Sequence, residues 1–576
     1  MDLPYSHYIP MINIRYNRED LRYIFLYGDN KEISSLEAHL NKIPSYQFLP
    51  SFSGIPKPEV FLNKFKKDNR VIYYCFSGLW KEIVDFCNKE KIQVDGIDSY
   101  FKYREFPLSL EEFTEYINKW NLNLQPRDYQ IKAAWLILKY RVSLSQLATR
   151  AGKTLIAYRI FRYMLENGAH NILMVVPNTT LVKQGVKDMS EYQEFFKSET
   201  VWAGGELCDS SNLTIGTFQS LVKRANKKDK KYDPKFFNKF DVICVDEAHT
   251  AKCKSIKMIL NQDFLKNVKL RFGFSGSLPE PNSIDSFACQ SLIGPMIQDI
   301  SSKELVDEGF LAKPEITQVR IKYDWTPQLE KAYIRCGEYL CGVDVMEEYT
   351  KRNGRKDKRA KLLPKEQQEF TIKNEKKLPL TLAKVKPLYE PQEYISYLID
   401  LCKAKGSNLL MLEQMLVHRS QKRLDIMDQL IISFNKNVLV FGHHTEYLRY
   451  LAEHFEKRFP DKKIYLITGK TNIKKREKTI NELLENNNCI LVASYGCVGT
   501  GLTLKNMDYC IFAQSFKSQV INKQALGRMM LKTSEKDTFE LYDLIDEFPT
   551  KRLYTQGLAK IKIYKKEGIE HRIVIK

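Results

Sequence analysis

The sequence lacks the features that are typical of zinc-binding, disulfide-linked, membrane-spanning and secreted proteins. Its twelve cysteines are scattered singly, with no Cys-x-x-Cys pair, which indicates small apolar side chains in a reducing compartment rather than zinc ligands or a disulfide framework. No apolar run approaches the ~18 residues that a membrane-spanning helix needs. The N-terminal residues lack the basic-then-apolar layout of a signal peptide. We therefore expect an intracellular, cytoplasmic protein with no membrane partner.

Acidic residues are outnumbered by basic ones. The chain has 90 lysines and arginines against 70 aspartates and glutamates, a net charge of +20. This excess favours a polyanionic partner, and nucleic acid above all, because basic side chains neutralise phosphates and release counterions. A generally basic proteome is the alternative explanation. With 576 residues, 43% of them apolar, the chain is long enough for about three or four domains.

One short stretch carries the strongest single motif. Residues 147–156 read Leu-Ala-Thr-Arg-Ala-Gly-Lys-Thr-Leu-Ile, between a strand-like run and apolar residues at helical spacing. A strand, a small-residue loop and a helix form a phosphate-binding loop, in which backbone amides face the phosphates, the lysine neutralises charge and the threonine reaches Mg²⁺. The full pattern has glycine where Leu147 stands, so an ordinary surface loop remains the alternative. The loop residues expected to bind ATP are Thr149, Arg150, Ala151, Gly152, Lys153 and Thr154.

An adenine-binding motif lies about twenty residues before this loop. Arg127 and Tyr129 can sandwich a purine ring, and Gln130 has both the donor and the acceptor that the edge of adenine requires. In isolation the motif is weak. Its position ahead of the phosphate-binding loop makes it a candidate adenine clamp.

An acidic motif follows the phosphate-binding loop about ninety residues later. A buried strand over Val242–Val245 leads into Asp246-Glu247-Ala-His249, which is a DEAH box. Adjacent carboxylates at one strand end are costly unless a cation lies there, so we expect Asp246 to hold Mg²⁺ and Glu247 to orient the attacking water. His249 can relay the nucleotide state to neighbouring loops or merely cap the chain.

Strand and helix patterns alternate from residue 141 to 320, which predicts a parallel sheet. Ligands bind at the carboxyl ends of the strands in such sheets. Two of these ends offer uncharged groups suited to a sugar-phosphate backbone, and a third ends in Ser-Gly-Ser beside the acidic motif. Caps and tight turns are the alternative in each case. The residues are Pro177, Asn178, Thr217 and Gln219 for nucleic acid, and Ser275 and Ser277 for coupling hydrolysis to movement.

These motifs together resemble superfamily 2 helicases, and more closely the UvsW-type phage helicases that act on branched DNA. The resemblance rests on residues 147–156, 175–180, 246–249, 274–278 and 302–309 and extends from about Leu124 to Glu547. It implies an α/β fold with two tandem RecA-like parallel-sheet domains and a small α+β N-terminal domain. The expected divisions are residues 1–115 (accessory, a candidate nucleic-acid-binding domain), 116–320 (first RecA-like, ATP-binding), 321–405 (basic insertion), 406–550 (second RecA-like) and 551–576 (tail).

The second half repeats strands that end in small or polar residues. The strand Asn437–Gly442 leads into two histidines that have no third metal ligand. A later strand ends in Thr-Gly, which is a candidate phosphate-binding group. In similar helicases the glycine-rich loop from Ser494 lies between nucleotide and nucleic acid, although Thr503 stands where the family often has an acid. The expected nucleic-acid contacts are His443, Thr468, Gly469, Ser494 and Tyr495, and Gly501 is expected at the nucleotide.

By resemblance, Gln524 and Arg528 face ATP, with Arg528 as an arginine finger. The family usually places another arginine where this chain has Leu531. Lys532 or Arg150 can substitute, but a lysine lacks the guanidinium fork.

The sequence leaves open the roles of two basic stretches. Near the N-terminus, Lys64, Lys66, Lys67 and Arg70 either contact a phosphate backbone or form a solvated face. The run Lys351–Lys361 either contacts nucleic acid or belongs to a surface insertion.

The expected function is that of an ATP- and Mg²⁺-dependent helicase or translocase, working as a monomer in phage replication, recombination and repair, in the host cytoplasm. DNA is the expected partner, with RNA or a DNA–RNA hybrid as alternatives. Two other functions remain open: a catalytically weak nucleic-acid-binding scaffold, and an RNA helicase or motor module of a restriction or transcription system.

Overall fold

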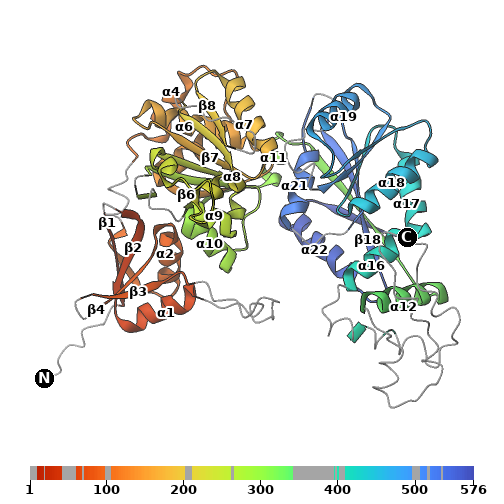
Figure 1. Ribbon diagram of the computed structural model, residues 1–576, viewed down its shortest axis with the longest axis horizontal. Helices are drawn as coiled ribbons and strands as arrows, with labels where there is room; N and C mark the ends of the chain where they lie inside the picture. Colours follow the sequence, from red (N-terminus) through yellow and green to blue (C-terminus); the bar gives the residue numbers. More distant parts are fainter. Residues whose placement is uncertain are drawn as a thin grey trace, which may run out of the picture. The chain divides into compact units, whose positions relative to one another are not determined.

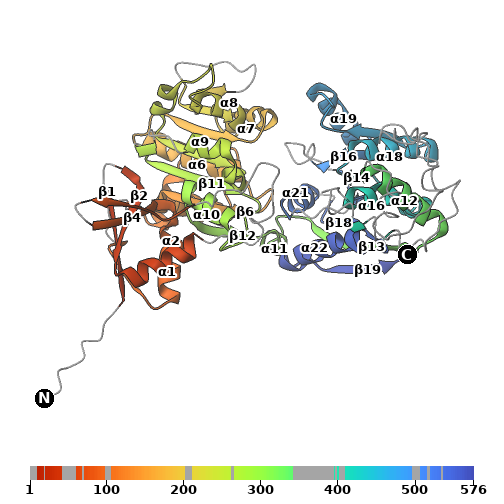
Figure 2. The same cartoon turned by 60° about the horizontal axis from the view of Figure 1, so that its bottom comes forward.

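A computed structural model describes residues 10–17, 20–41, 60–67, 70–97, 106–201, 211–260, 265–266, 268–341, 395, 399–400, 409–495, 506–514, 519–533 and 536–576. The chain divides into two compact units, Met1–Glu308 and Gly309–Lys576. Figure 1 colours the elements along the chain, and Figure 2 turns the same view. Within the described ranges, no helix is both long and apolar enough to cross a membrane.

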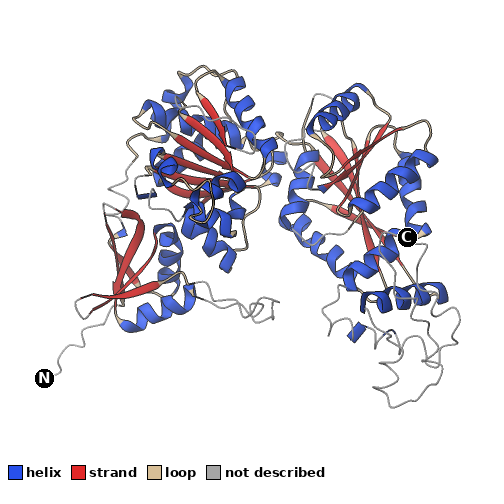
Figure 3. Cartoon of the chain, viewed as in Figure 1, coloured by secondary structure: helices blue, strands red, loops and turns tan. Residues whose placement is uncertain are grey.

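The first unit is built on a seven-stranded sheet of order β12-β6-β11-β10-β7-β9-β8, in which every pairing is parallel. Helices on both faces explain why strands such as β7 and β10 are almost continuously apolar and buried, as Figure 3 shows. The strands are β6 (Val142–Leu147), β7 (Ile172–Val176), β8 (Ser198–Val201), β9 (Leu213–Thr217), β10 (Val242–Asp246), β11 (Leu270–Ser275) and β12 (Met296–Ile300). The helices are α4 (Leu110–Asn118), α5 (Asp128–Tyr140), α6 (Lys153–Glu166), α7 (Thr179–Tyr192), α8 (Phe218–Ala225), α9 (Lys254–Leu260), α10 (Ile284–Ile293) and α11 (Ser302–Asp307).

The register of this sheet brings three functional motifs together. Ser275 at the end of β11 pairs with Gln146 near the end of β6, and Asp246 at the end of β10 pairs with Phe274. Because parallel strands end at the same edge, the loops after β6, β10 and β11 lie side by side.

A small α+β domain precedes this sheet, as the sequence predicts. Its five strands have the order β3-β4-β2-β1-β5 and are antiparallel except for the β1–β5 pair. The helices α1 and α2 share a core with one face of the sheet, and Phe287 of α10 packs into that core. The elements are β1 (Met11–Asn17), β2 (Asp20–Gly28), α1 (Asn30–Leu40), β3 (Asn63–Lys67), β4 (Arg70–Phe76), α2 (Trp80–Lys89) and β5 (Gln93–Asp95).

Helix α4 belongs with the first RecA-like sheet rather than with the small domain. A Ser109–Glu112 capping box begins it, and Phe113 packs edge-on against Tyr163 of α6 at 5.7 Å. The expected boundary at residue 115 therefore falls inside a helix.

The second unit repeats the seven-stranded parallel design, with strand order β15-β16-β14-β17-β18-β13-β19. Its strands are β13 (Lys313–Lys322), β14 (Val438–Gly442), β15 (Lys463–Ile467), β16 (Cys489–Ser494), β17 (Tyr509–Phe512), β18 (Thr538–Glu547) and β19 (His571–Ile575). Its helices are α12 (Pro327–Cys341), α16 (Leu409–His418), α17 (Gln421–Ser433), α18 (Thr445–Arg458), α19 (Ile473–Glu485), α21 (Gln519–Met529) and α22 (Arg552–Lys566).

Two expected boundaries are corrected by this sheet. Strand β13 pairs with β18 and β19, so residues 313–320 belong to the second unit and not to the first. The C-terminal residues 551–576 are not a separate tail, because β19 is a strand of the same sheet and Lys560 of α22 is buried in an ion pair with Asp543. A strand's own residues do not show which sheet it joins, and both errors arise from that. Most of the expected 321–405 insertion, including Lys351–Lys361, lies outside the described residues.

Candidate functional site

The predicted phosphate-binding loop connects β6 to α6. Helix α6 begins at Lys153, directly after Gly152, whose φ is +81°. Arg150 also has a left-handed backbone, with φ of +72°. A Cβ atom added at Gly152 would lie 2.3 Å from Nε2 of Gln130, so both backbone conformation and space require glycine here.

The predicted adenine motif packs directly on this loop. The hydroxyl of Tyr129 and Nε2 of Gln130 each donate a hydrogen bond to the carbonyl oxygen of Ala151, both at 2.9 Å. Gln130 is buried, and its Oε1 accepts from the backbone N–H of Arg127 at 3.1 Å. The guanidinium of Arg127 lies 6.0 Å from the centre of the Tyr129 ring. In this conformation Nε2 of Gln130 therefore holds the loop while Oε1 bonds the backbone at the start of α5, and the reading of an adenine edge by Gln130 stays a prediction.

Lys153, after β6, and Glu247, after β10, approach each other past the end of β11, the strand between β6 and β10. The Nζ atom of Lys153 lies 3.8 Å from Oε1 of Glu247, and the two side chains are 16% and 19% exposed. A Cβ added at Gly276, between the two predicted coupling serines, would lie 3.5 Å from Oγ1 of Thr149 and 3.7 Å from Nζ of Lys153. The loops after β6, β10 and β11 thus form one site.

The three predicted coupling residues form a continuous polar chain from the acidic motif. Nδ1 of His249 lies 3.3 Å from Oε2 of Glu247 and 2.9 Å from Oγ of Ser275. Ser275 in turn donates to the carbonyl oxygen of Ser277 at 2.8 Å. Glu247 has a left-handed backbone, with φ of +53°, and this turns its side chain back toward the histidine. A change at Glu247 can therefore reach β11 through its contact with His249 and the hydrogen bond between His249 and Ser275.

The donors at this edge suit magnesium. Thr154 is the second residue of α6 and Asp246 ends β10, so one hydroxyl and one carboxylate are on hand. Mg²⁺ bound with a nucleotide commonly takes one or two carboxylates, with phosphate oxygens and water as its other ligands. Among the described residues, no group of three or more His, Cys, Asp or Glu side chains could hold a metal without such help.

The first-unit residues predicted to contact nucleic acid lie at the same sheet edge. Asn178 and Thr217 follow the paired strands β7 and β9, and each is the N-cap of the next helix. Asn178 accepts from the amide of Leu181 at 3.1 Å, whereas Thr217 is buried and accepts from Ser220 at 3.4 Å. Gln219 is exposed and Pro177 is partly exposed. The side chain of Thr217 is thus a structural cap, as the alternative reading of this position allowed.

In the second unit, the residues predicted to contact nucleic acid fall into two groups, one at the strand ends and one in the core. His443 and Thr468 follow β14 and β15, and Ser494 is the last residue of β16. Because β16 pairs with both other strands, the three residues lie along one edge. His443 and Gly469 are exposed. Tyr495, by contrast, is a core residue: its ring stacks on Phe441 with centres 5.2 Å apart. The predicted side-chain contact of Tyr495 with nucleic acid is therefore wrong. Gly501 and Thr503 lie outside the described residues.

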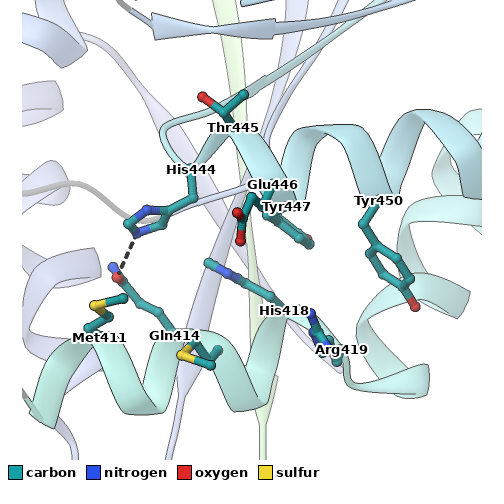
Figure 4. A pocket seen from close by; sticks show the side chains of 10 residues that line it. Met411, Gln414, His418, Arg419, His444, Thr445, Glu446, Tyr447 and Tyr450 are labelled. Atoms are coloured by element: carbon teal, nitrogen blue, oxygen red, sulfur yellow. Dashed lines mark hydrogen bonds between the residues drawn. The ribbon is translucent and has the colours of Figure 1, made fainter. Parts of the chain in front are cut away.

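A pocket lies between α16 and the start of α18 (Figure 4). It has a volume of about 190 Å³ and is lined by Gln414 and His418 on one side and by His444 and Tyr450 on the other. Nε2 of His444 lies 3.1 Å from Oε1 of Gln414. Burial, helped by nearby Arg423 and His444, holds the pKa of His418 well below its usual range.

Gln514 organises this region, and the sequence analysis missed it. Its Oε1 accepts from the backbone amides of His443 and, at 3.0 Å, His444. Its Nε2 lies 2.9 Å from Nε2 of His418. Gln514 thereby joins the ends of β14 and β17 to α16. A polar residue just after the buried strand Tyr509–Phe512 was the available signal.

Helix α21 carries Gln524 and Arg528 four residues apart, so both lie on one helix face. Leu531, in the place of the family's further arginine, forms a β-bridge with Leu311. Lys532, its proposed substitute, lies 3.1 Å from Asp537 in an ion pair.

Two family models match the chain, one in each unit. The model described as "Type III restriction enzyme, res subunit" matches residues 123–280, and the "Helicase conserved C-terminal domain" matches residues 422–530. The first covers the phosphate-binding loop and the DEAH box, and the second covers the strand ends of the second sheet and α21. The two matches fit a superfamily 2 helicase.

Individual relatives match the chain over part or most of its length. The ATP-dependent DNA helicase uvsW of Enterobacteria phage T4 is 24% identical over 481 residues, which are 81% of this chain and 78% of that protein. The DNA 3'-5' translocase XPB2 of Sulfurisphaera tokodaii is 25% identical over 278 residues, which are 48% of this chain and 55% of that protein. Among solved structures, T4 UvsW aligns over 98% of this chain and 99% of its own, at 21% identity and a TM-score of 0.41.

Proposed function

We propose that this chain is an ATP-dependent motor that moves on DNA and remodels branched DNA such as forks, junctions and R-loops. The observation that carries the proposal is the line of side chains from Lys153 through Glu247 and His249 to Ser275, all at one edge of a parallel sheet. Such a line joins a phosphate-binding group to the loop after β11 through a carboxylate. It suits a site at which hydrolysis of a nucleotide changes the conformation of another part of the protein.

Each group at this edge has a proposed role. Lys153 would neutralise phosphate oxygens, with Thr154 and Asp246 holding Mg²⁺. Glu247 would orient the attacking water, and His249 would carry the change in its environment to Ser275. The loop that contains Gly152 would supply backbone amides, held in place by Tyr129 and Gln130. Gln524 and Arg528 would contact the nucleotide from the second unit, as the family resemblance implies.

DNA is the proposed track, and the chain is proposed to act as a monomer in the cytoplasm. The relatives named above are a DNA helicase and a DNA translocase, which supports DNA over RNA. Phosphates would be held by exposed groups at the strand ends, including Asn178, Gln219, His443 and Gly469. The net charge of +20 favours such binding and predicts that it weakens steeply with salt.

The experiment compares activators of ATP hydrolysis. Purified protein is given forked DNA, an R-loop, linear duplex DNA or duplex RNA, and phosphate release is measured. The proposal expects forked DNA and the R-loop to stimulate more than linear duplex DNA, and duplex RNA to stimulate least. Equal stimulation by linear and forked DNA would contradict the proposed preference for branched DNA. Stimulation by duplex RNA alone would show that the motor acts on RNA and not on DNA.

One observation favours a second candidate, a nucleic-acid-binding scaffold with weak hydrolysis. The position of the family's further arginine is taken by Leu531, bridged to Leu311, and Lys532 is already paired with Asp537. The scaffold predicts tight binding of ATP and DNA with little turnover of bound ATP. A single-turnover measurement with radiolabelled ATP separates the two candidates, since the motor must release phosphate from most of the bound nucleotide.

A further inference from the structure

The two faces of the small N-terminal sheet differ in composition. One face, with Ile14, Ile24 and Leu26, packs on α1 and α2 and is buried. Figures 1 and 3 show both helices on that same side. Since side chains alternate along a strand, the residues between these belong to the opposite face. Among the described strands, six aromatic residues occupy it, which we call the aromatic face: Tyr23, Phe25, Tyr27, Phe65, Tyr74 and Phe76.

The register makes the aromatic face continuous across three strands. Phe25 of β2 lies directly opposite Tyr74 of β4, and Tyr23 lies opposite Phe76. The ring of Tyr74 has its centre 5.7 Å from that of Tyr23, 6.4 Å from that of Phe25 and 5.7 Å from that of Phe65. Tyr27 and Phe65 are 38% and 41% exposed. Single exposed aromatics are common on protein surfaces, but a group of five rings in contact is not, and here the rings are those of Tyr23, Phe25, Phe65, Tyr74 and Phe76.

Basic side chains adjoin the aromatic face. Arg15 lies opposite Phe25, and its guanidinium lies 5.3 Å from the centre of the Tyr27 ring. Lys67 and Arg70 pair with each other next to Phe65, on the same face. The four strands β1 to β4 together contain six lysines and arginines and a single acidic residue, Asp20.

The sequence had placed Lys64 in one cluster with Lys67 and Arg70. The structure divides that cluster, because Lys64 is on the other face of β3, where it pairs with Glu37 of α1 at 3.2 Å. The basic groups that remain with the aromatic face are therefore Arg15, Lys67 and Arg70.

We propose that the aromatic face binds single-stranded nucleic acid, with bases stacked on its rings and phosphates near its arginines and lysine. Rings on a sheet can stack only on bases that are unpaired, because a duplex hides the faces of its bases. Stacking tolerates any base, so the site is not sequence-specific. The inference rests on the proposed function in that its ligand is the track of the motor, and it gives the small domain a role in holding a strand that is already open.

The first test asks where an oligonucleotide touches the chain. Full-length protein is mixed with single-stranded oligonucleotides containing 5-iodouracil, as DNA or as RNA, irradiated, and the crosslinked peptides are identified by mass spectrometry. The proposal expects crosslinks in the peptides of β2, β3 or β4. Crosslinks confined to residues 106–576 would overturn it.

The second test measures affinity. The double variant Tyr27→Leu/Phe65→Leu removes two exposed rings but keeps apolar side chains, and fluorescence anisotropy reports binding of labelled oligothymidylate and of blunt duplex. A matched control is Val71→Ala, which changes an exposed apolar residue on the other face of β4. Each stacked ring is worth about 1–3 kcal/mol, so we expect the double variant to bind the single strand at least about tenfold more weakly, and duplex equally well. The control and a Tyr27→Trp variant should bind like the parent.

Three outcomes would overturn the proposal: unchanged single-strand affinity in the double variant, an equal loss for duplex, or a loss of thermal stability or change of oligomeric state with no change in binding. The last outcome would show that the face is covered by protein. Failure here is distinguishable from failure of the motor, because Lys153→Ala should leave the β2–β4 crosslinks unchanged whatever it does to ATP hydrolysis.

Discussion

The Nζ atom of Lys153 lies 3.8 Å from Oε1 of Glu247, although the two residues are far apart in sequence and follow different strands. Lys153 opens α6 and Glu247 follows β10, so this pair joins the two strongest motifs of the chain at one point. Both side chains are mostly buried, where a charge interacts more strongly than in water. The pair gives the phosphate-binding group and the proposed water-orienting group a shared environment, and the predictions below follow from it.

Gly152→Ala should disrupt the loop for two separate reasons. Its φ of +81° disfavours any Cβ, and the added atom would lie 2.3 Å from Nε2 of Gln130. We expect a loss of roughly 1–3 kcal/mol of stability and at least about tenfold weaker ATP binding. Thermal unfolding and nucleotide titration measure the two effects.

Gly168→Ala is the matched control for that variant. Gly168 has a similar φ of +85°, but nothing lies within 4 Å of an added Cβ. It should therefore show the backbone cost without the loss of ATP binding. Equal ATP affinity in the Gly152 and Gly168 variants would contradict the role given to Gln130.

His249→Ala should separate hydrolysis from its stimulation by DNA. The ring bridges Glu247 and Ser275, so its removal breaks the polar chain but leaves Lys153 and Glu247 in place. A coupling of about 1–3 kcal/mol would reduce DNA stimulation by roughly 5- to 150-fold, with the basal rate changed much less. Steady-state phosphate release with and without forked DNA tests this. His170→Ala, at an exposed histidine of the same unit, should behave like the parent; a parallel fall of basal and stimulated rates in His249→Ala would count against a coupling role.

Glu547 should make the second unit sensitive to acid. Hydrogen bonds from Arg320, at 2.6 Å, and from Lys551 lower the pKa of Glu547 from 4.5 to about 2. The folded pKa is below the unfolded one, so the stabilisation is full above about pH 4.5 and is lost as pH falls toward 2. Glu547→Gln should cost about 1–2 kcal/mol at neutral pH and make the unfolding temperature fall less between pH 6 and pH 3.5.

Glu315→Gln is the control for the acid experiment, since Glu315 is an exposed residue of β13, the strand that carries Arg320. Its acid profile should match that of the parent. The assignment to Glu547 fails if the Glu547 variant retains the full acid slope.

Much of the site could be read from the sequence because strand ends of a parallel sheet meet at one edge. The motifs after β6, β10 and β11 each follow an apolar run, and the structure brings Lys153, Glu247 and Ser275 together as that rule requires. The polar chain through His249 was likewise predictable as a relay, since its members lie in two of these loops.

What the sequence did not reveal depends on long-range packing. Tyr495 follows a buried strand as His443 does, but only the positions of Phe441 and Phe512 make it a core residue. The bond from Gln130 to Ala151 joins two motifs that pattern reasoning treats separately. The pairing of β13 with strands from the far end of the chain leaves no local signal, because its apolar residues would suit either sheet.

The most direct test of the central claim is DNA-stimulated ATP hydrolysis by the Lys153→Ala variant, compared with the parent chain at matched folding and DNA affinity. A lysine that neutralises transferred phosphate should be worth several kcal/mol, so the account predicts a fall in the stimulated rate of at least about a hundredfold, with DNA binding retained. A parent chain without DNA- or RNA-stimulated hydrolysis, or a variant that hydrolyses ATP as fast as the parent, would contradict it.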